Sequence, residues 1–171
     1  VLAWPFGLMA ASINLSLYLQ KGIYADSCLE GFYIVLYIYG WYQWLYGNHN
    51  GSSLTISQTS PSLALRLILI GVFISVVLYY SLSHLTNSTV PFIDATTTVV
   101  CLIAQWMTGK KYIESWFLWL ASDAMYLWLY WYKGIPFHVA LMVIYFGMGF
   151  YGFYNWYKIM NSSSNGALEH L

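Results

Sequence analysis

The chain has 171 residues, of which 60% are hydrophobic and only 7% are charged, and its six basic and six acidic side chains give a net charge of zero. A water-soluble domain carries about 25% charged residues, so this composition excludes a soluble enzyme and a nucleic-acid-binding protein. The composition instead predicts a chain whose solvent is the lipid bilayer. The two cysteines, Cys28 and Cys101, suggest neither a disulfide framework nor a metal site, and no cofactor is expected.

Six apolar stretches are each long enough to cross about 30 Å of hydrocarbon as a helix, which takes roughly 20 residues. In chain order they cover residues 1–19, 24–46, 62–85, 91–109, 113–132 and 136–157. Glycine, proline, lysine and polar residues separate them, as is typical of turns. The predicted fold class is therefore an all-α membrane protein with six visible transmembrane helices, and the polar residues 159–171 are expected to form a disordered tail.

The distribution of lysine and arginine predicts the orientation, because cytoplasmic loops carry an excess of both. Four of these residues lie near one side of the predicted membrane and two near the other, namely Arg66, Lys110, Lys111 and Lys158 against Lys21 and Lys133. The C-terminus is then cytoplasmic in a multi-pass protein. With a resemblance described below, the predicted location is the bacterial inner membrane.

An internal repeat relates the first two stretches to the last two. A shift of 112 residues aligns them without a gap, and places Lys21-Gly22-Ile23 on Lys133-Gly134-Ile135 and 40–44 on 152–156. The matched blocks read Gly-Trp-Tyr-Gln-Trp and Gly-Phe-Tyr-Asn-Trp. Chance agreement between two aromatic-rich segments is the alternative, but it explains poorly why a turn and a five-residue block match in one register.

The shift spans four helices, an even number, so the two copies have the same orientation. Parallel repeats that hold a substrate near the membrane midplane are one plan of transporters. We predict a first repeat at 1–47, a loop and linking helix at 48–86 and a second repeat at 87–158. Because the stretch 91–109 precedes the second copy and nothing precedes the first, the predicted architecture is seven helices, three plus one plus three, with the first helix missing here.

Three segments carry a resemblance to a known family. They are YADSCLEGFYIVLYIYGWYQWLYG at 24–47, PFIDATTTVVCLIAQWMTGKKYIESW at 91–116 and IESWFLWLASDAMYLWLYWYKGI at 113–135. They resemble the PnuC-type vitamin transporters. The resemblance implies the seven-helix fold, a homo-oligomer that is a trimer, and passive uptake of a B-type vitamin. Nicotinamide riboside is the lead substrate that it implies, and thiamine is the alternative.

Two acids inside predicted helices are the strongest local signal of function. Asp123 lies roughly 15 Å from the start of its stretch and Glu30 roughly 9 Å from the start of its own, at 1.5 Å per residue. A charged side chain at a helix centre costs on the order of 2.5–3.5 kcal/mol, so such residues usually have a partner or a task. Hydrogen bonds to a neighbouring helix are one interpretation. The other is that a cationic vitamin ring supplies the positive charge.

Aromatic side chains accompany these acids at helical spacing. Trp119 precedes Asp123 by four residues, so both share a helix face, which suits a flat cation. The resemblance implies that Trp119 stacks on the substrate and that Asp123 and Glu30 are polar substrate contacts. The further candidates for substrate binding are Tyr33, Tyr37, Asn14, Trp116 and Tyr126. Packing or lipid contact is the alternative for each tyrosine, and Asn14 equally suits a hydrogen bond between helices.

Three tryptophans near the predicted cytoplasmic ends have two interpretations. Trp41, Trp44 and Trp156 lie where tryptophan anchors a membrane protein at the headgroup level. The occurrence of Trp44 and Trp156 at matched positions of the repeat also fits an inner gate or an interface. Anchoring is the simpler of the two.

The predicted function is facilitated diffusion of a vitamin with alternating access, and the predicted partners are that small molecule, the bilayer and further copies of the chain. An intramembrane enzyme is the alternative from another class, but no Gly-x-Ser-x-Gly or His-Glu-x-x-His pattern occurs. A membrane subunit that transports nothing is the third possibility. No catalytic residue and no nucleic-acid partner are expected.

Overall fold

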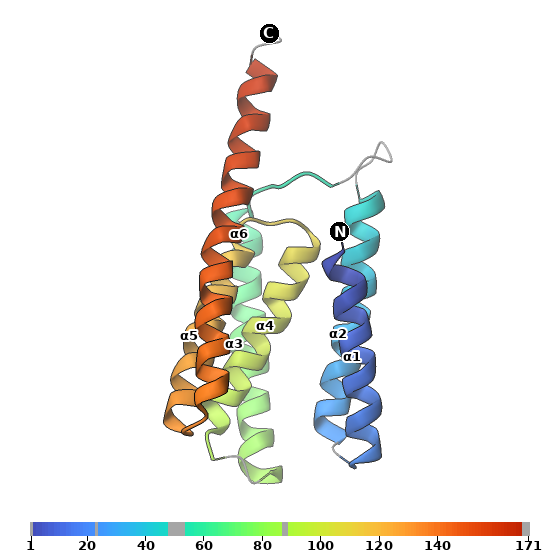
Figure 1. Ribbon diagram of the computed structural model, residues 1–171, viewed down its shortest axis with the longest axis vertical. Helices are drawn as coiled ribbons and strands as arrows, with labels where there is room; N and C mark the ends of the chain where they lie inside the picture. The colour runs from blue at the N-terminus through green and yellow to red at the C-terminus, as the bar shows by residue number, and fades with distance from the viewer. Residues whose placement is uncertain (1, 23, 48–53, 87–88, 169–171) are drawn as a thin grey trace. The chain divides into compact units, whose positions relative to one another are not determined.

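The computed structural model describes residues 2–22, 24–47, 54–86 and 89–168, and all of its regular elements in these ranges are helices. Figure 1 shows their course. The helices are α1 (Ala3–Gln20), α2 (Tyr24–Tyr46), α3 (Pro61–Leu85), α4 (Pro91–Gly109), α5 (Ser115–Tyr132) and α6 (Pro136–Leu168). The six predicted stretches thus correspond to six helices. Residues 48–53 of the predicted polar loop, Ile23 of the first turn and the last three residues of the expected tail lie outside the described ranges.

The end of α6 corrects one prediction. The helix continues to Leu168, although a disordered tail was expected from residue 159. No proline interrupts residues 159–168, and the Ser162 hydroxyl donates to the carbonyl of Lys158, one turn back, at 3.0 Å. Polar composition alone therefore did not end the helix. The other boundaries agree with the sequence to within two residues.

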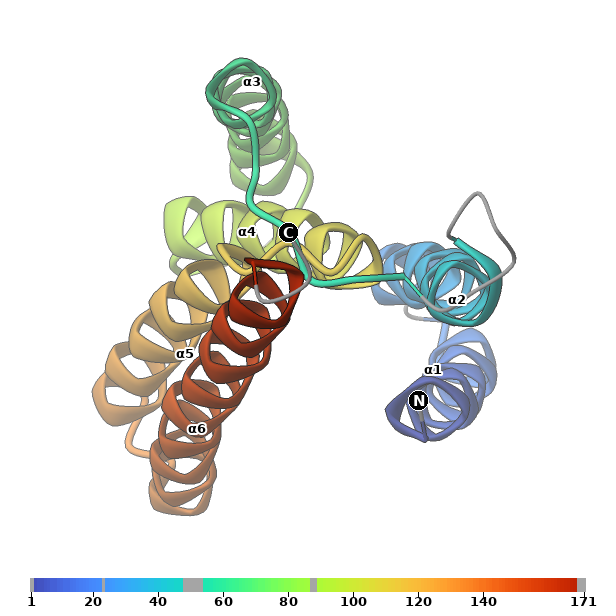
Figure 2. The same cartoon turned by 90° about the horizontal axis from the view of Figure 1, so that it is seen from above.

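The chain divides into two compact units. The first contains α1, α2 and the segment Gln105–Lys111, which includes the end of α4. The second contains α3, the rest of α4, α5 and α6. In each unit one pair of consecutive helices packs closely, and we call α1 and α2 the first hairpin and α5 and α6 the second hairpin. The helices of each hairpin lie side by side in both views (Figures 1 and 2).

The same turn closes both hairpins. Gly22 and Gly134 each follow a helix with a left-handed backbone, at φ of +72° and +67°. Lys21 and Lys133 donate their amides to carbonyls four residues back, at 3.1 and 2.9 Å. Glycine ends a helix in this way because it has no Cβ to disfavour positive φ. The Lys-Gly block that carried the repeat in the sequence is therefore a helix-ending turn.

The same close approach joins the helices at the other end of each hairpin. Trp4 lies against Gly40, and Trp116 lies against Gly152, so that an added Cβ on either glycine would collide with the indole ring. A second tryptophan completes each group at 5.4 Å between ring centroids, with Trp44 edge-on to Trp4 and Trp156 edge-on to Trp116. We call these groups the Trp-Gly-Trp frames. They show that the two hairpins share one register.

The second unit also holds a short tie between two connecting segments. Ser57 and Tyr112 form an isolated β-bridge, and Ile113 donates its amide to the carbonyl of Ser57 at 3.0 Å. The carboxylate of Glu114 accepts from the amide and the hydroxyl of Thr59, at 2.9 and 2.7 Å. The chain before α3 is thereby fixed to the start of α5.

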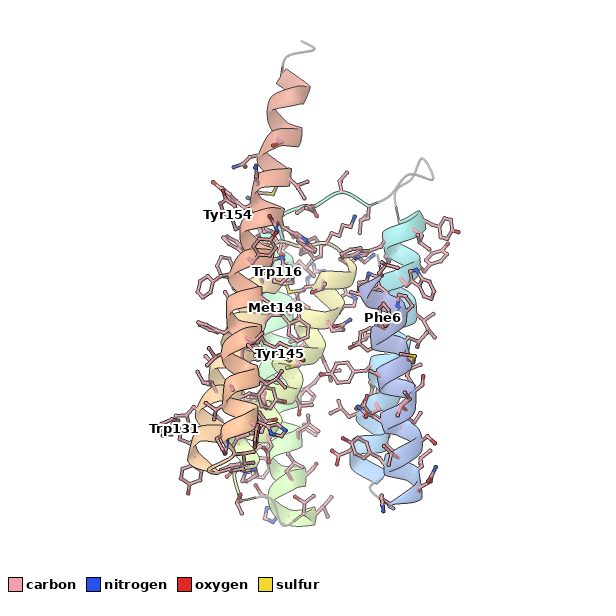
Figure 3. The ribbon with its side chains drawn as sticks, in the orientation of Figure 1. Phe6, Trp116, Trp131, Tyr145, Met148 and Tyr154 are labelled. Atoms are coloured by element: carbon pink, nitrogen blue, oxygen red, sulfur yellow. The ribbon has the colours of Figure 1, made fainter. Side chains whose placement is uncertain are left out.

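Most large apolar side chains of the helices point outward, as expected of a chain in lipid. Figure 3 shows Phe6, Trp131 and Tyr154 projecting from α1, α5 and α6. By length and hydropathy alone, two of the described helices, Pro61–Leu85 and Pro136–Ser162, are apolar enough to cross a bilayer. The other four have 18 to 23 residues.

Candidate functional site

One face of α5 carries the candidate residues of the second unit. Trp116, Trp119, Asp123 and Tyr126 follow each other at helical spacing, and all four are half-buried. The helix is regular through this region. The Ser122 hydroxyl donates a hydrogen bond to the carbonyl of Trp119 at 2.8 Å. The tryptophan and the acid thus share the face that the sequence predicted. We call these four residues the α5 face.

Asp123 differs from the other acids of the described chain in its surroundings. It lies in the middle of α5, and no residue described in its unit forms a hydrogen bond or an ion pair with its carboxylate. An acid in hydrocarbon without a partner is costly, and such residues mark substrate or ion pathways. The first interpretation offered by the sequence, a hydrogen bond to a neighbouring helix, is therefore not the arrangement found in this unit.

Tyr126 connects the α5 face to α4. Its hydroxyl is a hydrogen-bond partner of the Thr97 side chain, and Asp94 acts on it electrostatically. Its ring stacks on that of Tyr130, one turn further along α5, at 5.8 Å and 15°. Tyr126 therefore has a packing role between α4 and α5. Thr97 was missed in the sequence because a buried threonine in a helix gives no pattern of its own.

In the first unit, the two polar candidates contact each other. The Asn14 amide donates to the Glu30 carboxylate at 3.0 Å and so joins α1 to α2. Both side chains are half-buried. For these residues the interhelical interpretation is therefore confirmed. A hydrogen bond of this kind does not neutralise the charge of the carboxylate, so Glu30 still offers an anionic oxygen.

Tyr33 and Tyr37 continue from Glu30 along the same face of α2. Their rings lie 6.2 Å apart, and Tyr37 is also edge-on to Trp4 at 6.2 Å. The Glu30 carboxylate is near enough to Tyr37 to act on it electrostatically. Tyr37 therefore lies between the polar pair and the first Trp-Gly-Trp frame. We call Asn14, Glu30, Tyr33 and Tyr37 the first-hairpin patch.

The three gate candidates lie in different surroundings. Trp44 donates its indole N–H to the carbonyl of Thr108 at 3.0 Å, and the Lys111 ammonium lies 4.8 Å from the centroid of its ring. Trp156 packs on Trp116 in the second frame. Trp41 is half-buried on α2. Trp44 is thus held by a hydrogen bond and a cation within the first unit, and Trp156 by ring packing within the second.

Lys111 was expected only as a charge that orients the chain, and the structure gives it further contacts. It follows α4 with a left-handed backbone, at φ of 55°, and its ammonium donates to the carbonyl of Leu54. Burial lowers the pKa of this lysine below its usual range. It therefore helps to hold the end of α4 against α2 within the first unit.

The described chain also has an open hollow of about 250 Å³ in the second unit. Its lining is Ile93, Ala124, Met125 and Trp128, and it contains none of the predicted site residues. Because these side chains are almost entirely apolar, the hollow offers no charge or hydrogen bond to a vitamin. Among the described residues no group of three or more His, Cys, Asp or Glu side chains suits a metal ion.

Comparison with known proteins assigns the chain to a family. The family model described as "Nicotinamide mononucleotide transporter" matches residues 1–158. The chain belongs to this family. Its members are transporters and not enzymes, so the alternative of an intramembrane enzyme is set aside.

Several curated relatives of this family member are named for a vitamin. The nicotinamide riboside transporter PnuC of Neisseria mucosa is 26% identical over 93% of this chain and 65% of its own length. The PnuC of Escherichia coli is 23% identical over 96% and 80%. The riboflavin/roseoflavin transporter RibM of Streptomyces davaonensis is 26% identical over 77% and 63%. The chain thus spans about two thirds of the first of these proteins.

A solved structure has the same fold. The crystal structure of the vitamin B3 transporter PnuC superposes with a TM-score of 0.67 at 23% sequence identity, over 93% of this chain and 72% of that one. The resemblance inferred from the sequence is therefore confirmed at the level of family and fold. Membership of this family agrees with the prediction of an inner-membrane protein built of apolar helices.

Proposed function

We propose that the chain takes up a cationic B-type vitamin by facilitated diffusion with alternating access, and that nicotinamide riboside is the substrate. The observation that carries this proposal is the Asp123 carboxylate, half-buried in α5 without a partner in its unit and one helical turn from Trp119. Two relatives named as nicotinamide riboside transporters support the substrate.

The chemistry of the substrate suits these residues. The pyridinium ring of nicotinamide riboside is flat, electron-poor and positively charged. An indole ring attracts such a cation with about 0.5–2 kcal/mol, depending on desolvation. A carboxylate in a medium of low dielectric constant adds an attraction that an amide does not provide. We assign ring stacking to Trp119, charge compensation to Asp123, and lesser contacts to Trp116 and Tyr126.

Within the first unit by itself, the first-hairpin patch also offers polar groups to a vitamin. Glu30 and Asn14 present a carboxylate and an amide that suit the hydroxyl groups of a ribose, and Tyr33 and Tyr37 add aromatic surface. A thiamine transporter is the second candidate, since an aminopyrimidine pairs well with a carboxylate such as Glu30. The riboflavin relative makes that vitamin a third ligand for the same titration.

The larger assembly is part of the proposal. The internal repeat favours the three-plus-one-plus-three arrangement, and the resemblance to PnuC-type transporters favours a trimer. The excess of lysine and arginine on one side favours a cytoplasmic C-terminus. Trp41, Trp44 and Trp156 are then candidates for an inner gate or an interface.

Uptake of labelled vitamin into liposomes that contain the purified chain tests the function. We expect saturable uptake of nicotinamide riboside without ATP or an ion gradient, because the vitamin's own gradient drives facilitated diffusion. Titration with thiamine and riboflavin identifies the preferred vitamin. Absence of saturable uptake of any of the three would contradict the proposal and favour a subunit that does not transport.

Variants of the α5 face test the site. Trp119→Ala and Asp123→Ala should each weaken binding of nicotinamide riboside at least tenfold, which corresponds to about 1.4 kcal/mol. Asp123→Asn keeps a hydrogen-bonding group and removes the charge, so a comparable loss would identify the charge as the cause. Trp131→Ala is the matched control, because Trp131 is on the same helix but is 77% exposed (Figure 3). Unchanged affinity in all three site variants would refute the assignment.

A further inference from the structure

Gly7, in α1, lies against the ring of Tyr37 in α2. A Cβ atom added at Gly7 would come within 2.7 Å of Cζ and 2.9 Å of Cδ1 of that ring, which is closer than such contacts occur in proteins. Gly7 lies within a regular helix and has no left-handed backbone that would require glycine. Alanine would favour the helix by about 1 kcal/mol. The position of the Tyr37 ring is therefore the feature that requires a glycine here.

The second hairpin has the opposite arrangement of large and small residues. The frames show that the two hairpins share one register, so Gly7 corresponds to Trp119 and Tyr37 corresponds to Gly149. In the first hairpin the glycine is on the first helix and the ring on the second. In the second hairpin the ring is on the first helix and the glycine on the second. Gly149 is buried, and a Cβ there would lie 2.9 Å from Cδ2 of Leu120.

At this level the first hairpin packs a ring against its glycine, whereas the second packs the Leu120 side chain against Gly149. Van der Waals packing between membrane helices depends on small residues that let the other helix or its side chains approach. In the first hairpin Gly7 provides that room, and the ring of Tyr37 fills it between Tyr33 and Trp4. Any side chain at position 7 forces this ring away from α1.

We infer that Gly7 is a positioning residue for transport, which acts by fixing the ring of Tyr37 in the first-hairpin patch. The inference rests on the proposed function, because Tyr37 is a proposed substrate contact. A displaced ring changes the aromatic surface beside Glu30, so it weakens a contact of the proposed binding site. Gly7 itself need not touch the vitamin.

The test is a set of four variants in liposome uptake of labelled nicotinamide riboside. Gly7→Ala should raise KM roughly fivefold and change kcat by less than about twofold, because binding contacts are altered and not the conformational step. Gly31→Ala is the control, since nothing lies within 4 Å of a Cβ at that glycine of the same hairpin, and its KM should equal that of the unchanged chain. A role in stability alone would lower the thermal stability of Gly7→Ala and leave its KM unchanged.

The remaining two variants show whether the effect passes through Tyr37. In the Tyr37→Leu background the ring is absent, so adding Gly7→Ala should cause no further rise in KM. A Gly7→Ala chain with the KM of the unchanged protein, or an equal rise in both backgrounds, would overturn the inference. If Gly7→Ala does not reach the membrane, the Tyr37→Leu pair alone decides, because it lacks the collision. If the chain without any substitution takes up no nicotinamide riboside, the proposed function is overturned, and this inference with it.

Discussion

The two hairpins have the same ends and different middles. Each is closed by a Lys-Gly turn at one end and by a Trp-Gly-Trp frame at the other, with 5.4 Å between the paired tryptophan rings in both. The indole N–H groups of Trp4 and Trp116 are also alike, since both are buried without a hydrogen-bond partner among the described residues. The repeated ends therefore set the geometry of a hairpin.

The middles of the hairpins carry the chemical differences. Asn14 and Glu30 in the first hairpin correspond to Tyr126 and Met142 in the second, so the interhelical polar pair occurs once. Asp123 corresponds to Ala11, which is buried. The two frames thus have the same packing contacts, while the central faces of the two hairpins differ. The packing at the ends is therefore common to both hairpins, and the polar side chains of the middles differ between them.

The largest expected effect comes from breaking the frames. Gly40→Ala and Gly152→Ala should each destabilise the protein by about 1–3 kcal/mol, because a Cβ at either position collides with an indole ring. Thermal unfolding of the detergent-solubilised protein measures the loss. Gly31→Ala and Gly147→Ala are the matched controls, with open space around the Cβ and a gain of up to about 1 kcal/mol. If only one frame variant were destabilised, the frames would not be equivalent.

An intermediate effect is expected at the polar pair of the first hairpin. Asn14→Leu removes the donor to Glu30 and leaves a half-buried carboxylate without it, so we expect a loss of about 1 kcal/mol in unfolding experiments. Glu30→Gln retains an acceptor for Asn14 and should be close to neutral in stability. A loss of equal size in both variants would mean that the hydrogen bond stabilises the hairpin only when its acceptor is charged.

The smallest effect is expected at Lys111, whose ammonium lies over the ring of Trp44 in the first frame. Burial lowers the pKa of Lys111 in the folded state, so between this value and the ordinary value of about 10.4 the unfolded chain binds more protons. Stability should therefore rise with pH in that window. Thermal unfolding from pH 7 to 10 should show a rise that Lys111→Met lacks. An identical pH profile in the two proteins would contradict a buried ammonium at this position.

Most of the fold could be predicted from the sequence, because its signals are local. The limits of α2 and α4 agree with the apolar stretches, and Pro61 and Pro136 begin α3 and α6. The exception is the end of α6, where polar residues were interpreted as disorder although the segment contains no proline. The contacts of Lys111, Glu114 and Thr59 join residues distant in the chain, so no local pattern could have revealed them.

The candidate site could be predicted in part. Helical spacing placed Trp119 and Asp123 on one face, and the same rule aligned Glu30, Tyr33 and Tyr37. The sequence left two interpretations open for both acids. It gave no means to tell that Glu30 has Asn14 as a donor and that Asp123 has no partner in its unit, because these depend on which residues of other helices lie opposite them.

By itself the sequence determined the membrane class, the six helices, the repeated turns and the family resemblance, since composition, periodicity and motifs follow the chain order. Only the tertiary structure decided which glycines are tightly packed and which have open space, and which acid is paired. Gly7 and Gly31 are the same type of residue. The ring of Tyr37 lies against Gly7, whereas no atom lies within 4 Å of a Cβ added at Gly31. The reason is physical. Packing and hydrogen bonding depend on distances between helices, and the spacing of residues along one helix does not determine those distances.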